Sequence, residues 1–104
     1  MKELIKGVSK LTEEEAKMSM IKFPLFSSTH EGYAVIKEEV EEAGEELETI
    51  IFNLDNMWRN VRANDKEITM KYARYLRTTA INLAAESIQV AAMAQKFIDS
   101  FKEA

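Results

Sequence analysis

Apolar residues recur at steps of three and four along most of the chain, which is the spacing that gathers them on one face of a helix. The pattern predicts helices over about residues 2–21, 29–62 and 67–101. The apolar positions of the two long helices are Ile36, Val40, Ala43, Leu47, Ile50, Ile51, Leu54, Trp58 and Val61, then Ala73, Leu76, Ala80, Leu83, Ala84, Ile88, Ala91, Ile98 and Phe101. Residues 2–21 form one helix or two short ones, because Thr12 and Glu15 fit a capping box inside this run.

The breaks between the helices have their own signals. Pro24 excludes helical backbone at the residue before it, so a loop is expected over residues 22–28. Ser28 and Glu31 form a capping-box pattern at the start of the second helix, and Asn64 or Asp65 caps the third. One proline and three glycines in 104 residues leave few turn residues for a sheet, which favours an all-α fold.

The length of the two long helices predicts pairing of chains. About 35 residues at a rise of 1.5 Å span roughly 50 Å, whereas a compact domain of this size has a radius of gyration of about 13 Å. Either the second helix is kinked, for example at Gly44, or two chains share one core. We expect residues 1–104 to form a single helical domain, a long-helix bundle completed by dimerisation, because two-fold dimers are the commonest closed oligomers.

Composition excludes several classes of function. The chain has 14 basic and 18 acidic residues and a formal net charge of −4, which argues against nucleic acid as a partner. The absence of cysteine excludes disulfides, thiolate zinc sites and a cysteine nucleophile. No apolar run approaches the roughly 18 residues that a membrane span needs. The expectation is a cytoplasmic protein that binds neither nucleic acid nor membrane.

Charge is segregated along the second helix. Eight Glu and one Lys lie between residues 31 and 48, and six bases with two acids lie between residues 59 and 77. Solvated or paired faces of two antiparallel helices account for most of these charges. Glu39, however, borders the apolar stripe, and Glu42 follows it by one turn. Such a pair is costly without a cation and suits Mg²⁺, which prefers oxygen ligands.

Glu86 on the third helix is a possible counterpart. The residues around it are mostly small or apolar, and Asn82, Gln89 and Met93 share its face. A carboxylate in such surroundings calls for a partner. Exposure at the bundle surface, or a bond to an arginine of a neighbouring helix, explains it equally.

Two segments, His30–Glu42 and Glu86–Ala92, resemble the MazG-like all-α nucleoside triphosphate pyrophosphatases. That family carries E-x-x-E on one helix and E-x-x-D on the next, and the resemblance covers about residues 22–101. It implies that Glu39, Glu42, Glu86 and Gln89 hold Mg²⁺, or Mn²⁺ in its place. Gln89 stands where the family has Asp, and its side chain brings no charge. The E-x-x-Q form of the second motif resembles a branch of the family that is often encoded by phages.

The resemblance also implies an activity and an assembly. The family hydrolyses NTP or dNTP to the monophosphate and pyrophosphate, a housekeeping reaction of the nucleotide pool, as dimers or tetramers. Glu38 and Glu39 would be catalytic, with Glu38 as the acceptor of a proton from water. The residues expected to bind substrate are Lys71, Arg74, Arg77 and His30. Surface ion pairs explain the three bases equally well, and an exposed first-turn position explains His30.

Two other functions stay open. Because Gln89 weakens the ligand set, the chain could be a non-catalytic helical-bundle dimer that keeps the family frame with a degraded metal site. The acidic segment Glu38–Glu48 could instead bind a basic protein or peptide, a hypothesis that rests on charge alone.

Overall fold

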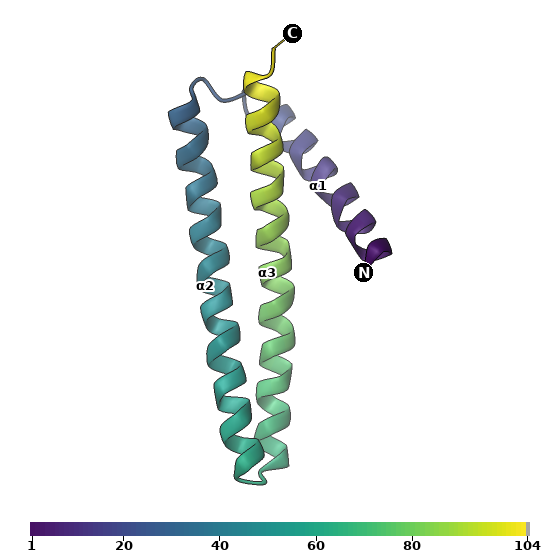
Figure 1. Ribbon diagram of the computed structural model, residues 1–104, viewed down its shortest axis with the longest axis vertical. Helices are drawn as coiled ribbons and strands as arrows, with labels where there is room; N and C mark the ends of the chain where they lie inside the picture. Colours follow the sequence, from purple (N-terminus) through teal and green to yellow (C-terminus); the bar gives the residue numbers. More distant parts are fainter. Residues whose placement is uncertain (104) are drawn as a thin grey trace. The chain divides into compact units, whose positions relative to one another are not determined.

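The computed structural model describes residues 1–103, which form three helices: α1 (Lys2–Lys22), α2 (Thr29–Arg62) and α3 (Lys66–Phe101) (Figure 1). The all-α prediction with long helices is confirmed. α1 is one unbroken helix from Lys2 to Lys22. Thr12 caps no second helix, since its hydroxyl donates to the carbonyl of Val8 at 3.0 Å within α1. None of the helices described here is long and apolar enough to cross a membrane.

The loop between α1 and α2 follows from its sequence. Phe23 has extended backbone, with φ −132° and ψ 147°, as the following Pro24 requires. The Oγ atom of Ser28 accepts a hydrogen bond from the backbone N–H of Glu31 at 3.1 Å. This bond satisfies one of the free donors at the start of α2.

The turn between α2 and α3 is a Schellman motif. Asn64 adopts left-handed backbone with φ 56°, and the N–H of Asp65 donates to the carbonyl of Asn60 at 3.0 Å. The carboxylate of Asp65 then accepts from the N–H of Ile68 at 3.1 Å. Asp65, and not Asn64, is therefore the N-cap of α3.

Contacts divide the described residues into two compact units: unit 1 comprises residues 1–41 and 86–103, and unit 2 comprises residues 42–85. The core lies in unit 1. Its buried residues are Ala16, Phe26, Ala92 and Met93, which come from α1, the loop and α3, and Met20, Val35, Ile36 and Phe97 pack against them. Ser100 ties the loop to α3 by accepting the N–H of Phe26 at 3.0 Å.

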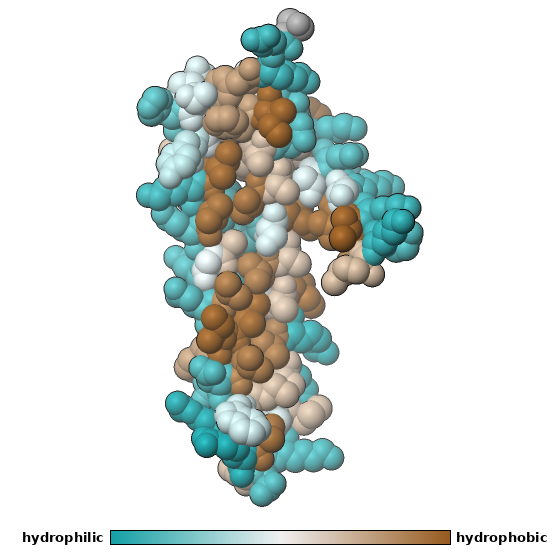
Figure 2. All heavy atoms as spheres, viewed as in Figure 1, coloured by the Kyte–Doolittle hydropathy of each residue, from teal (hydrophilic) through white to brown (hydrophobic). Residues whose placement is uncertain are grey.

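Unit 2 is an antiparallel pair of helix segments with a polar interior. Within residues 42–85, all of which are described, the two buried residues are Asn53 and Thr79, and they form a side-chain hydrogen bond of 3.2 Å. Five large apolar side chains of α2 in unit 2 lie on one stripe and are 44 to 58% exposed. Together with Gly44 they form what we call the exposed seam: Gly44, Leu47, Ile51, Leu54, Trp58 and Val61. Figure 2 shows apolar atoms gathered over this part of the molecule.

Candidate metal site and adjacent pocket

Three carboxylates predicted as metal ligands converge. Glu39, Glu42 and Glu86 each place one oxygen within 4.8 Å of the other two. Glu39 and Glu42 are one turn apart on α2, so helical spacing sets their proximity, and Glu86 comes from α3. Glu39 and Glu86 are half-buried, whereas Glu42 is exposed. Two consecutive helices thus bring together acids that lie far apart in the sequence and that the sequence pattern singled out.

The donor set fits a hard cation. Three negative charges at this separation repel one another, and a divalent ion bound among them would offset that repulsion. Mg²⁺ binds oxygen at about 2.0–2.1 Å, so two of its ligands lie at most about 4.2 Å apart. Small rotations of the three side chains would bring their oxygens, which lie within 4.8 Å of one another, to the separations that one Mg²⁺ ion allows.

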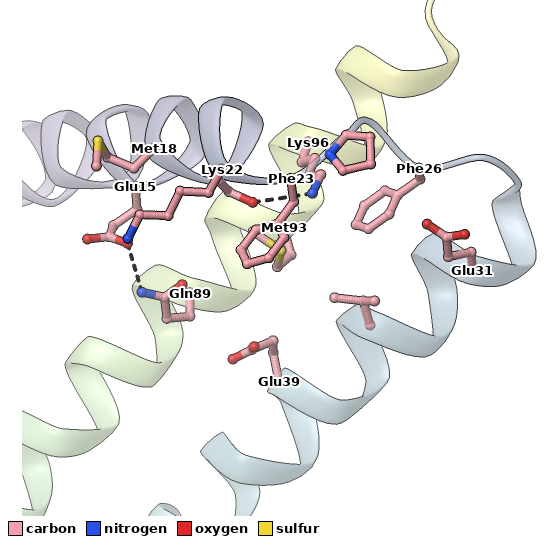
Figure 3. A pocket seen from close by; sticks show the side chains of 13 residues that line it. Glu15, Met18, Lys22, Phe23, Phe26, Glu31, Glu39, Gln89, Met93 and Lys96 are labelled. Carbon is pink, nitrogen blue, oxygen red and sulfur yellow. Dashed lines mark hydrogen bonds between the residues drawn. The ribbon is translucent and has the colours of Figure 1, made fainter.

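Gln89, the fourth predicted ligand, is engaged with α1. Its Nε2 donates a hydrogen bond to the Oε2 of Glu15 at 3.0 Å (Figure 3). Since the amide nitrogen carries no lone pair for a metal, the amide oxygen is the atom of Gln89 that a cation could use. The hydrogen bond turns the amide so that this oxygen points away from Glu15.

A pocket of about 530 Å³ lies within unit 1 and includes Glu39 in its lining. Aromatic and aliphatic side chains from α1, the loop, α2 and α3 make up much of its wall, as Figure 3 shows. The lining residues are Glu15, Met18, Ser19, Lys22, Phe23, Pro24, Phe26, Glu31, Val35, Glu39, Gln89, Met93 and Lys96. Because Glu39 belongs both to this lining and to the carboxylate cluster, a ligand in the pocket would lie beside a cation held by the cluster.

Lys96 is the buried cation of this pocket, with only 4% of its surface exposed. Its ammonium donates to the Oγ of Ser19 at 3.3 Å. It also lies 4.7 Å from the ring centroid of Phe26 and 5.8 Å from that of Phe23, where the negative face of an aromatic ring attracts a cation. Lysine is seldom buried to this degree without a specific partner.

The remaining predicted residues lie elsewhere. Glu38 is an exposed residue of α2. His30 is exposed in the first turn of α2 and lines a separate pocket of about 340 Å³. Lys71, Arg74 and Arg77 belong to unit 2, where the ammonium of Lys71 lies near the rings of Tyr72 and Tyr75, at 6.0 and 5.7 Å.

Sequence reasoning missed the pocket residues Glu15, Ser19, Phe23 and Lys96. A signal existed for Lys96, which follows Ala92 by one helical turn on a stripe of small and apolar residues. The contact of α1 with α3 had no comparable signal, because α1 exposes most of its residues and its apolar spacing does not reveal its neighbour.

No protein-family model matches the chain, and neither a curated protein nor a solved structure matches it. The resemblance to MazG-like pyrophosphatases therefore rests on the motifs of this chain.

Proposed function

We propose that the chain is a Mg²⁺-dependent nucleoside triphosphate pyrophosphohydrolase, which converts NTP or dNTP and water to the monophosphate and pyrophosphate. The observation that carries this proposal is the convergence of Glu39, Glu42 and Glu86 to within 4.8 Å from two helices. The adjoining pocket supports it, because a nucleotide whose phosphates reached these acids would have a largely apolar cavity beside them.

The roles of the side chains follow from their chemistry. Glu39, Glu42 and Glu86 would hold the ion, with the amide oxygen of Gln89 as a weaker ligand. When bound, the ion would neutralise the phosphate oxygens and activate a water molecule. The exposed carboxylate of Glu38 would accept the proton of that water.

Lys71, Arg74 and Arg77 would contact phosphate oxygens of the substrate, and His30 would contact the substrate or transfer a proton. Arginine and lysine suit phosphate oxygens because both donate charged hydrogen bonds. The proposal allows these residues to come from the same chain or from a second copy.

We include a second copy of the chain in the proposal because the exposed seam has the spacing of a coiled-coil interface. Its members recur at steps of three and four, as in a heptad. The buried and half-buried positions of α2 in unit 2 include Glu46, Asn53 and Asn60, so the exposed seam is more apolar than the inward face. A solvent-exposed stripe of this kind marks an interaction surface.

Charge favours an antiparallel arrangement of the two copies. Antiparallel pairing places Leu47 opposite Trp58 of the second copy and Ile51 opposite its Leu54, so the acidic half of α2 lies along the basic end of the second copy, whereas parallel pairing sets the acidic segments against each other. Opposite charges beside a coiled-coil seam select the orientation. The two-fold axis would form this acidic-to-basic contact twice.

Hydrolysis tests the proposed function directly. The protein is incubated with Mg²⁺ and a panel of canonical and modified NTPs and dNTPs, and pyrophosphate release is measured. Glu39→Gln and Glu86→Gln should lower turnover by at least about 100-fold, because each removes a charged ligand. Glu48→Gln, at an exposed position of α2, is the matched control and should keep turnover. Absence of turnover with every nucleotide would refute the activity.

The engagement of Gln89 with Glu15 favours one alternative, a non-catalytic helical-bundle dimer with a degraded metal site. In that case the dimer would form, but neither Mg²⁺ nor nucleotide would change its melting temperature. Stabilisation by Mg²⁺ that disappears in Glu86→Gln would exclude this alternative.

A further inference from the structure

Resting on the proposed function, we infer that the pocket of unit 1 binds the nucleobase and that Lys96 selects bases with an exocyclic carbonyl oxygen. The inference concerns substrate choice, on which the carboxylate cluster has no bearing. Its starting point is the burial of Lys96, a residue 4% exposed, in the wall of a cavity of about 530 Å³.

The first step is the shape and surface of the pocket. Phe23 and Met18 are about half exposed or more, at 61% and 48%, and Met93 is 8% exposed, yet all three line the same cavity. A planar heteroaromatic ring would cover the exposed side chains and stack on the Phe23 ring. Glu39 belongs both to this lining and to the carboxylate cluster, so the phosphates attached to such a base would lie beside the cluster.

The second step is the hydrogen-bonding chemistry of Lys96. An ammonium group has three donors and no acceptor. The hydroxyl of Ser19 takes one donor at 3.3 Å, and the rings of Phe26 and Phe23 attract the charge without accepting a strong hydrogen bond. A carbonyl oxygen on a bound ring would take a further donor. An exocyclic amine at the same place would present its own donors to the ammonium and would be disfavoured.

Inosine and adenosine provide a matched pair of probes, because they differ only at position 6 and the adjacent N1, where inosine has a carbonyl and N–H. Both lack phosphate, so their binding without divalent metal isolates the pocket from the carboxylate cluster. Dissociation constants are measured by ligand-observed NMR titration. We expect inosine to bind at least about tenfold more tightly than adenosine, which corresponds to one added charge-assisted hydrogen bond.

Lys96→Met keeps the apolar stem and removes the donors. It should reduce inosine binding to the level of adenosine and leave adenosine binding unchanged, a difference that a purely structural role of Lys96 would not produce. Lys96→Arg keeps a charged donor and should retain the preference. Lys102→Met is the matched control, because Lys102 is an exposed residue just beyond α3.

A preference for inosine that is lost in Lys96→Met and kept in Lys102→Met supports the inference. Equal binding of the two nucleosides by the unmodified protein overturns it, and so does a preference that persists in Lys96→Met. If circular dichroism shows that Lys96→Met does not fold, Phe23→Leu, at an exposed position, is used instead. This variant should weaken the binding of inosine and of adenosine by the same factor. Unchanged binding of both nucleosides would refute the base pocket.

The inference and the proposed function fail separately. Pyrophosphate release without any nucleoside binding would overturn the base pocket and leave the hydrolase standing. Selective inosine binding without pyrophosphate release from any nucleotide of the panel, ITP included, would overturn the hydrolase and leave the pocket as a purine-binding site.

Discussion

The side chains of Gln89 and Glu15 join α3 to α1 through a hydrogen bond of 3.0 Å. Gln89→Glu would set two carboxylates against each other at this contact and should lower the free energy of unfolding by about 1 kcal/mol. The exchanged pair Glu15→Gln with Gln89→Glu restores one donor and one carboxylate and should recover most of the loss. Denaturation of the two single variants and the double variant measures the coupling. Additive effects would show that the two residues do not interact.

Substitution of the metal-site residue Glu42 should affect stability in opposite directions with and without Mg²⁺. Without Mg²⁺, Glu42→Gln removes one of three charges within 4.8 Å and should raise the melting temperature, because like charges repel. With Mg²⁺ at ten times its dissociation constant, the unmodified protein should gain about 1.4 kcal/mol, and Glu42→Gln should gain less. Calorimetric melting at several Mg²⁺ concentrations tests both effects, with Glu48→Gln as the control. Equal Mg²⁺ responses in the three proteins would refute the site.

The close approach of α2 to the core of unit 1 can be tested at Gly32. A Cβ atom there would lie 2.5 Å from the ring of Phe97 and 3.0 Å from that of Phe26. Gly32→Ala should therefore destabilise the protein by about 1–3 kcal/mol, although alanine favours helix.

Gly7→Ala is the matched control for this change, because its Cβ atom would meet nothing within 4 Å. It should stabilise α1 by up to about 1 kcal/mol. Thermal melts compare the two variants, and stabilisation by both would contradict the packing of Gly32 on Phe97.

We expect two copies of the chain to associate through the exposed seam, and we expect one charged residue placed in the seam to prevent this association. Ile51, 51% exposed, would lie in the middle of the proposed interface, so Ile51→Glu would bury two like charges and should weaken dimerisation at least about 100-fold. Thr49→Glu adds the same charge at an exposed position of α2 outside the seam and should leave the dimer intact. Sedimentation over a range of concentrations distinguishes them. A monomer at all concentrations would refute the seam as an interface.

The helices and their ends could be predicted because their signals are local. Periodic apolar residues define α2 and α3, and the caps at Ser28 and Asp65 lie within three residues of the N–H groups they satisfy. The acids of the cluster were also predictable, since Glu39 and Glu42 share a turn. Two contacts of α1 with α3 were not predictable. The bonds Gln89–Glu15 and Lys96–Ser19 join residues 74 and 77 positions apart, and their formation depends on how α1 packs, which exposed helical spacing does not determine.

The buried pair of unit 2 predicts an asymmetry between two substitutions. The amide of Asn53 donates to the hydroxyl of Thr79 at 3.2 Å, and that hydroxyl donates in turn to the carbonyl of Tyr75 at 2.7 Å. Thr79→Val removes the acceptor and leaves a buried amide without this partner, which should cost about 1–3 kcal/mol. Asn53→Leu leaves Thr79 bonded to Tyr75 and should cost less or stabilise the hairpin. Chemical denaturation compares both with the double variant, which should be close to Asn53→Leu. A larger loss in Asn53→Leu than in Thr79→Val would show that the amide has the more important role in fixing the helix pair.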